Sequence, residues 1–359
     1  MSTAAVPSAP SATRAQRAIA WLSRYQVVIV TTLLWSLSMH WWEGERMWTS
    51  HSPAFEPLRM MGVVDAWQHG IWDARWLPLF DQGYGYPIFS YHSPLFSWIG
   101  ASLLVLTGKP VLALKLAVMV FFLAGGLGCR VLGASFWAEP GTSDHTSGDF
   151  AFAGWASATY LFTNIFVRGS LSEFAASALL PWLFWGIWLI TADARKYAKG
   201  AGVIAIALTL LILSHNAIAV YAVMLVALPL PILFRPAGGR GWTAWAAGGA
   251  MAACISAFFA VPVLLEKPFV RLSNVAIPDV RYHFLRFDHL LSLGTWGLGL
   301  SGQDLDRTMP RHQGLLLPFA LAAGVIAFRY FDGARLRRKT LALLALNGLT
   351  LLMCMLPSV

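Results

Sequence analysis

The feature that most constrains the fold is a series of apolar runs, each long enough to cross the hydrocarbon core of a membrane. A helix rises about 1.5 Å per residue, so roughly 20 apolar residues cross a core of about 30 Å. This pattern predicts an all-α protein, a polytopic bundle of about nine transmembrane helices. The predicted spans are residues 22–42, 111–134, 150–167, 172–192, 200–214, 216–234, 242–263, 314–329 and 340–356.

The composition excludes a soluble globular protein. Hydrophobic residues make up 57% of the chain and charged residues only 12%, whereas soluble domains are roughly 25% charged. Aromatic residues reach 13%, and Trp and Tyr are typical of the two membrane–water interfaces. The lipid bilayer is therefore the first partner that the sequence predicts.

The basic residues indicate how the chain is oriented. They gather in three short stretches between apolar runs, at 195–199, 235–240 and 329–339. Short basic loops stay in the cytoplasm, so these stretches are predicted to be cytoplasmic and they account for the net charge of +9 without a nucleic-acid partner. The tail 1–21 carries Arg14 and Arg17 and is predicted to be cytoplasmic too, while 22–359 form one transmembrane domain. No small-residue cleavage site follows the first run, which favours a retained helix over a signal peptide.

A further apolar stretch at 92–107 does not fit this orientation as a full span. If it crossed, the three basic stretches would lie outside the cell. It opens with Ser93-Pro94, which is typical of a helix start, so a re-entrant or interfacial helix is predicted here. An alternative with the same orientation makes 150–167 the segment that does not span.

Two long loops are predicted on the outer face, at 43–91 and 266–312, and they hold almost every residue suited to chemistry. The first contains an amphipathic stretch at 57–71, which predicts a helix on the membrane surface. Its Gly- and Pro-rich aromatic part at 83–94 predicts turns, and its flat rings suit either a membrane interface or a sugar ring.

Neither loop has the spacing of a metal site. His283 and His289 are six residues apart, and no HxH or HExxH pattern occurs. No metal and no cofactor are therefore predicted, and a divalent cation would have to bind without a recognised ligand pattern.

Two polar groups are predicted to reach the same outer face from helix ends. One consists of Asn164, Arg168, Gly169, Ser172 and Glu173, and the other is the tight turn Ser214-His215-Asn216. Arg168 and Glu173 either pair or snorkel at the membrane edge, or they contribute to a ligand site.

The order of these motifs carries a resemblance. The segments GYGYPIFSYHSPL (83–95), RGSLSEFAASALLPW (168–182), LSHN (213–216), LLEKPF (264–269), YHFLRFDHLL (282–291), TWGLGLSG (295–302) and MPRHQG (309–314) follow one another. Together they resemble a bacterial multi-pass family called the 6-pyruvoyl-tetrahydropterin-synthase-related membrane region. That family is similar to the GT-C superfamily of glycosyltransferases, which use sugars carried on polyprenyl phosphates.

The resemblance implies a GT-C-like enzyme of the bacterial inner (plasma) membrane that acts at the extracytoplasmic face. A polyprenyl-phosphate-linked sugar would be the donor, and an acid of the first outer loop would take the acceptor proton. The implied catalytic candidates are Glu56, Asp73 and Asp65. The implied ligands of the substrate and of its lipid phosphate are Arg59, Arg75, Arg168, Glu173, His215, Arg281, His283 and Arg311.

The sequence departs from the expected pattern at one point. His51-Ser52 stands where a His-Asp pair is expected, which leaves Glu56 as the nearest acid. Pro57 fits the first position of a helix, so Glu56 has an alternative role as a cap of that helix. A non-enzymatic lipid-binding or transport protein of the same fold is therefore the alternative function.

The last apolar run is followed only by a few residues. Members of the resembling family continue with further helices, so the sequence predicts a domain fragment that is truncated at its C-terminal end.

Overall fold

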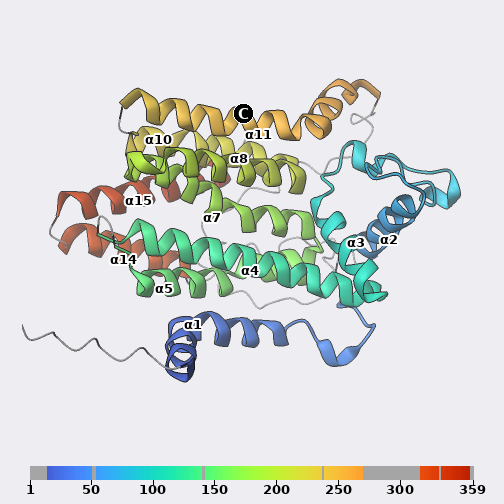
Figure 1. Cartoon of the computed structure of the whole chain (residues 1–359), viewed down its shortest axis with the longest axis horizontal. Helices are drawn as coiled ribbons and strands as arrows, with labels where there is room; N and C mark the ends of the chain where they lie inside the picture. The colour runs from blue at the N-terminus through green and yellow to red at the C-terminus, as the bar shows by residue number, and fades with distance from the viewer. Residues whose placement is uncertain are drawn as a thin grey trace, which may run out of the picture.

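A computed structural model describes residues 14–50, 54–139, 142–236, 238–269, 316–330 and 333–355. Within these ranges the protein is helical, and its one β-type contact is an isolated antiparallel bridge between Leu77 and Tyr86. Figure 1 shows most of the helices lying side by side along one common direction. The predicted all-α class is therefore confirmed for the described residues.

The helices follow the apolar runs of the sequence closely. The main helices are α1 (Arg14–Leu37), α2 (Phe55–Gln68), α3 (Leu95–Thr107), α4 (Pro110–Phe136), α5 (His145–Ala156), α6 (Thr159–Phe162), α7 (Leu171–Ala192), α8 (Tyr197–Ser214), α9 (Asn216–Ala222), α10 (Pro229–Phe234), α11 (Gly238–Leu265), α14 (Leu316–Tyr330) and α15 (Ala334–Met355). Two π-helical turns, Thr163–Arg168 and Val223–Ala227, extend α6 and α9.

Six helical segments are long and apolar enough to cross a membrane. They are Pro110–Phe136, His145–Arg168, Leu171–Ala192, Ala194–Ser214, Asn216–Phe234 and Gly238–Leu265. Each contains or closely matches one of the predicted spans. The predicted spans 22–42, 314–329 and 340–356 coincide largely with α1, α14 and α15, which are not among the six, so they stay predictions.

The short helix α3 does not reach across a membrane. Its 13 residues cover roughly 20 Å at the rise of an α-helix, less than the hydrocarbon core. It packs against α2 and α4, which agrees with the predicted non-spanning segment at 92–107. The alternative, in which 150–167 does not span, gains no support because His145–Arg168 is a 24-residue candidate span.

Close packing of α5 and α7 on α4 depends on glycines of α4. A Cβ atom at Gly125 would lie 2.2 Å from the Trp155 ring, and one at Gly128 would lie 2.7 Å from Trp182 Nε1. Both indole groups donate to backbone carbonyls of α4, at 2.9 Å and 2.8 Å. Larger residues at these two glycines would push the tryptophans out and break both hydrogen bonds.

The bundle has two chemically different ends. One end, at the right of Figure 1, carries α2, α3 and the segment that joins them, and we call it the α2 end. The three basic stretches lie at the opposite end, at the junctions of α7 with α8, α10 with α11 and α14 with α15. We call this second end the basic end.

Candidate functional site

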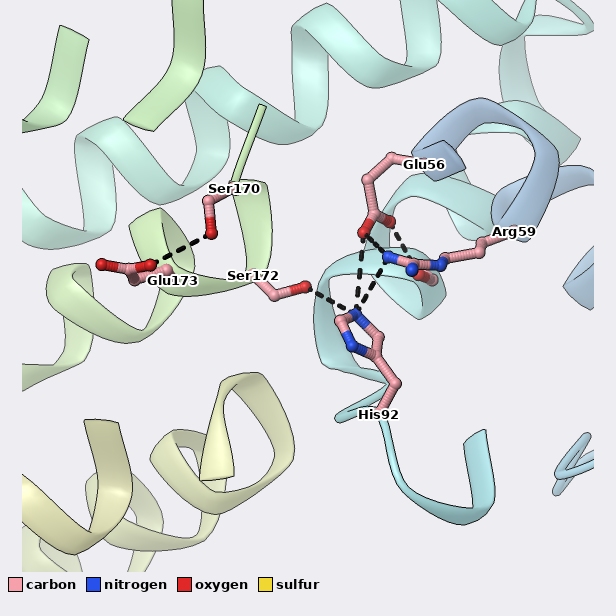
Figure 2. Close-up of polar contacts among 7 residues, drawn as sticks. Glu56, Arg59, His92, Ser170, Ser172 and Glu173 are labelled. Carbon is pink, nitrogen blue, oxygen red and sulfur yellow. Dashed lines mark hydrogen bonds and ion pairs between the residues drawn. The ribbon is translucent and has the colours of Figure 1, made fainter. Parts of the chain in front are cut away.

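A polar cluster lies at the α2 end, where three separate parts of the chain meet. Helix α2 contributes Glu56 and Arg59, the linker before α3 contributes His92, and the start of α7 contributes Ser172. Figure 2 shows the side chains of Glu56, Arg59 and His92 directed toward one another, with Ser172 approaching from the other side.

Glu56 is a buried, fully engaged carboxylate. Its side chain accepts hydrogen bonds from Arg59 Nη1 at 2.5 Å and from Ser97 Oγ at 2.9 Å, and the residue is only 3% exposed. Burial alone would raise the pKa of Glu56, but the contacts with His92, Arg59 and Ser97 outweigh it and lower the pKa to about 2. Glu56 is therefore ionised at neutral pH.

The alternative role of Glu56 as a helix cap is wrong. Helix α2 begins at Phe55, so its N-cap is Ala54, which makes no side-chain capping bond. Glu56 is the second residue of the helix, and its carboxylate accepts hydrogen bonds from Arg59 and Ser97 instead. The helix starts two residues earlier than Pro57 suggested because a proline is also tolerated within the first turn, where the backbone N–H groups have no helical partner.

His92 connects this pair to α7. Its Nε2 atom lies 3.0 Å from Arg59 Nη1, 3.2 Å from Ser172 Oγ and 3.8 Å from Glu56 Oε1. His92 was not selected from the sequence, although its position directly before the helix-start pair Ser93-Pro94 places it at a loop–helix junction. Ser97 was missed as well, because a serine in an apolar helix has no distinguishing pattern, whereas Ser172 belongs to the polar group predicted around Arg168 and Glu173.

Arg168 and Glu173 form a second acid–arginine pair. Arg168 Nη1 donates to Glu173 Oε1 at 2.8 Å and to Asn164 Oδ1 at 2.6 Å. Ser170 Oγ, at 3.1 Å, and the Tyr160 hydroxyl also donate to the Glu173 carboxylate. The π-helical turn Thr163–Arg168 and a left-handed Gly169 (φ 69°) reverse the chain between the two residues and bring them together.

The turn between α8 and α9 closes the cluster. Burial lowers the pKa of His215, and the neighbouring His92 and Arg168 lower that pKa further, which puts all three groups in one electrostatic environment. Asn216 Nδ2 donates to the Tyr91 carbonyl at 3.0 Å, and Ser93 Oγ donates to Asn216 Oδ1 at 2.7 Å. The predicted residues Glu56, Arg59, Arg168, Glu173 and His215 are thus gathered at the α2 end.

Several buried polar atoms near this cluster have no hydrogen-bond partner. Arg59 Nε and Asn164 Nδ2 are donors, and Ser214 Oγ is a hydroxyl. A buried polar atom without a partner costs about 1–3 kcal/mol. The cluster therefore holds donors suited to an acceptor-rich ligand.

Other predicted residues lie elsewhere on the α2 end. Asp73 is exposed. Asp65 lies 3.8 Å from His69 Nδ1 and lines a cavity of about 740 Å³ between α2, α3 and residues 79–81. Arg75 pairs with Glu266 at 3.0 Å. Arg281, His283 and Arg311 lie outside the described residues.

Within the described ranges, no three His, Cys, Asp or Glu side chains form a group suited to holding a metal ion. Scans of family models, curated proteins and solved structures found no match for this chain. The function is therefore inferred from the site itself.

Proposed function

We propose that this chain is a GT-C-like glycosyltransferase of the bacterial plasma membrane. In this proposal it transfers a sugar from a polyprenyl-phosphate carrier to an acceptor at the extracytoplasmic face. The observation that carries the proposal is the cluster at the α2 end, where two acid–arginine pairs and two histidines meet. Buried charges of this kind near a membrane surface favour a functional site over a packing role.

The sidedness of the site supports this assignment. The three basic stretches gather at the end opposite the cluster, and short basic loops remain in the cytoplasm. The α2 end then faces the extracytoplasmic side and the N-terminus is cytoplasmic. In the full proposal, α1, α14 and α15 supply the remaining three of nine spans.

The arginines suit the phosphate of a lipid carrier. Guanidinium groups bind phosphate oxygens through charge-assisted hydrogen bonds, and these are stronger than neutral ones. Arg59 keeps its buried Nε unpaired, so it has a free donor to offer a phosphate oxygen. Arg168 offers a second positive charge, and Arg281, His283 and Arg311 belong to the same proposed site.

The proposed reaction transfers one proton and replaces one carbon–oxygen bond at the anomeric carbon by another. The acceptor hydroxyl attacks the anomeric carbon, a new carbon–oxygen bond forms, and the bond from that carbon to the phosphate oxygen breaks. The electron pair stays on the leaving phosphate, which the arginines stabilise. Glu56 takes the hydroxyl proton, and it becomes more basic when Arg59 turns from the carboxylate toward the phosphate.

The alternative is a lipid-binding or transport protein of the same fold that performs no reaction. One observation favours it: both oxygens of Glu56 are occupied, by Arg59 and by Ser97. A carboxylate with a pKa of about 2 accepts a proton poorly at neutral pH. In this alternative the two pairs only hold a lipid phosphate.

Deletion of the gene, combined with lipid binding by the purified protein, separates these functions. A transferase predicts accumulation of a polyprenyl-phosphate-linked sugar in the deletion strain, reversed by the wild-type gene, and retention of polyprenyl phosphate by the purified chain in native mass spectrometry. Retention without accumulation favours the non-enzymatic protein. If neither is observed, both functions are wrong.

A further inference from the structure

The segment between α2 and α3 exposes an unusual number of aromatic rings. Trp72 is 73% exposed, Trp76 52%, Tyr84 83% and Tyr86 50%. Large aromatic side chains that are exposed along one segment indicate an interaction surface. We call these four rings the aromatic platform.

The backbone holds the platform in a fixed hairpin. Leu77 and Tyr86 exchange two backbone hydrogen bonds, of 3.0 Å and 3.1 Å. The tip contains Asp81 and Gln82, both with positive φ (53° and 58°). Such angles are rare for residues other than glycine and are often kept at binding sites.

Trp76 is held in position by Gly85 across the hairpin. A Cβ atom at Gly85 would lie 2.2 Å from Trp76 Nε1, and Gly85 has a φ of 82°. The indole therefore packs directly on the Gly85 backbone, which leaves its other side open. A ring fixed in this way loses little conformational entropy when a ligand packs on it.

The position of the hairpin argues against a lipid partner. Figure 1 shows the segment between α2 and α3 extending past the ends of α4 and α11, along the direction of the bundle. The backbone of this segment therefore reaches beyond the ends of these two helices, which favours an aqueous location. Asp73 and Asp81 lie beside them, and Arg75 is paired with Glu266, so the local charge also repels anionic headgroups.

The chemistry of the platform fits a sugar. Tyr and Trp combine a flat apolar face with an O–H or N–H donor, and a pyranose ring has an apolar C–H face with hydroxyl groups around its edge. The carboxylates of Asp73 and Asp81 and the amide of Gln82 are acceptors and donors for such hydroxyls.

We propose that the aromatic platform binds a neutral oligosaccharide in the aqueous space beside the membrane. Its identification as the acceptor of the sugar transfer rests on the proposed function. A chain of contacts links it to the site: Arg75 bonds the Glu266 carboxylate, and the Glu266 carbonyl accepts the Tyr91 hydroxyl at 2.9 Å. Tyr91 directly precedes His92.

The test is binding of cellohexaose and chitohexaose to the full chain in nanodiscs, by calorimetry and by hydrogen exchange. These probes are extended and expose both faces of their rings. We expect protection of residues 72–86 and an affinity that falls at least about tenfold in Trp76→Ala, equivalent to about 1.4 kcal/mol. Gly85→Ala displaces the ring and should weaken binding in the same direction, while Trp76→Phe keeps a flat face and most of the affinity.

Trp242→Ala is the matched control, because Trp242 is an exposed tryptophan near the start of α11. It should bind both probes like the wild type. The proposal is overturned if neither oligosaccharide binds, if Trp76→Ala binds unchanged, if hexalysine alone protects the hairpin, or if brominated lipids quench the Trp76 ring. No donor is present, so this result does not depend on whether transfer occurs.

Discussion

The two ends of the bundle each contain a buried pair of arginine and carboxylate, but only one pair is complete. At the basic end, Arg130 Nε donates to Asp149 at 2.7 Å, Arg130 Nη2 donates to the Arg24 carbonyl at 3.2 Å, and the guanidinium lies 4.7 Å from the centre of the Tyr25 ring. At the α2 end, Arg59 bonds Glu56 and His92 but leaves its buried Nε unpaired.

The difference separates a packing role from a ligand role. Arg130 joins α1, α4 and α5, and none of its atoms is among the unpaired buried atoms of the described residues. A cost of about 1–3 kcal/mol for an unpaired buried donor is hard to explain by packing alone. The same kind of pair is therefore fully bonded at the basic end and keeps an unpaired donor at the α2 end, where we propose that a ligand binds.

The largest expected effect is on turnover, when the carboxylate at the α2 end, Glu56, is neutralised and compared with Asp149 at the basic end. Glu56→Gln should lower sugar transfer from a polyprenyl phosphate by roughly 10²–10⁴-fold, the usual loss when a general base is removed. Asp149→Asn is the matched control at the basic end. It should change turnover per folded molecule by less than about twofold, because it does not touch the substrate.

Turnover is measured on equal amounts of folded protein, since Glu56→Gln also leaves the Arg59 charge poorly compensated. Near-normal turnover of Glu56→Gln would show that Glu56 is not the general base, and Asp73 or Asp65 would become the candidates. If Asp149→Asn lost as much turnover as Glu56→Gln, the functional distinction between the two ends would be wrong.

The next effect is on stability against acid. The pKa of Glu56 falls from 4.5 to about 2 on folding, so its stabilising contribution is fully present above pH 4.5 and is lost as the pH falls through about 2. That contribution is about 3 kcal/mol. Denaturant unfolding at pH 7 and at pH 3 should show a smaller loss of stability for Glu56→Gln than for the wild type.

Asp149→Asn again serves as the comparison, because it keeps Glu56 and should keep the acid-dependent loss that Glu56 causes. An acid-dependent loss of equal size in Glu56→Gln and in the wild type would show that Glu56 is not the group responsible.

The smallest effect compares two histidines in contact with arginines. His92→Ala should lower turnover by roughly tenfold. The imidazole contacts both Arg59 and Ser172, and its removal ends the link that aligns α2 with α7. His145, which lies 3.1 Å from Arg24 at the exposed surface of the basic end, is the control. His145→Ala should change neither turnover nor, beyond about 0.5 kcal/mol, the free energy of unfolding.

Rescue by a second variant distinguishes an alignment role of His92 from a purely structural one. His92→Gln, which retains a hydrogen-bonding side chain, should recover part of the turnover that His92→Ala loses. Equal losses of turnover in His92→Ala and His145→Ala would contradict the proposed difference between the α2 end and the basic end.

Several local features were predictable from the sequence. The non-spanning segment before residue 110 followed from charge in the short loops, and α3 is indeed too short to cross. The helix after Glu56 followed from its apolar pattern, a rule that depends only on local sequence. The pair of Glu56 and Arg59 at 2.5 Å was not predicted, because the helix was expected to begin at Pro57, which left Glu56 outside the three-residue spacing of a helix face.

The apolar runs were sufficient to predict the helical class and the six candidate spans, because apolar length and backbone hydrogen bonding leave helices as the simple solution in a membrane. It also placed five of the predicted site residues on segments that meet at one end. The bridge that His92 forms between Arg59 and Ser172, residues 33 and 80 positions away from it, became visible only in the folded chain. Such contacts depend on how helices pack across the bundle, and no local pattern encodes the direction in which one helix faces another.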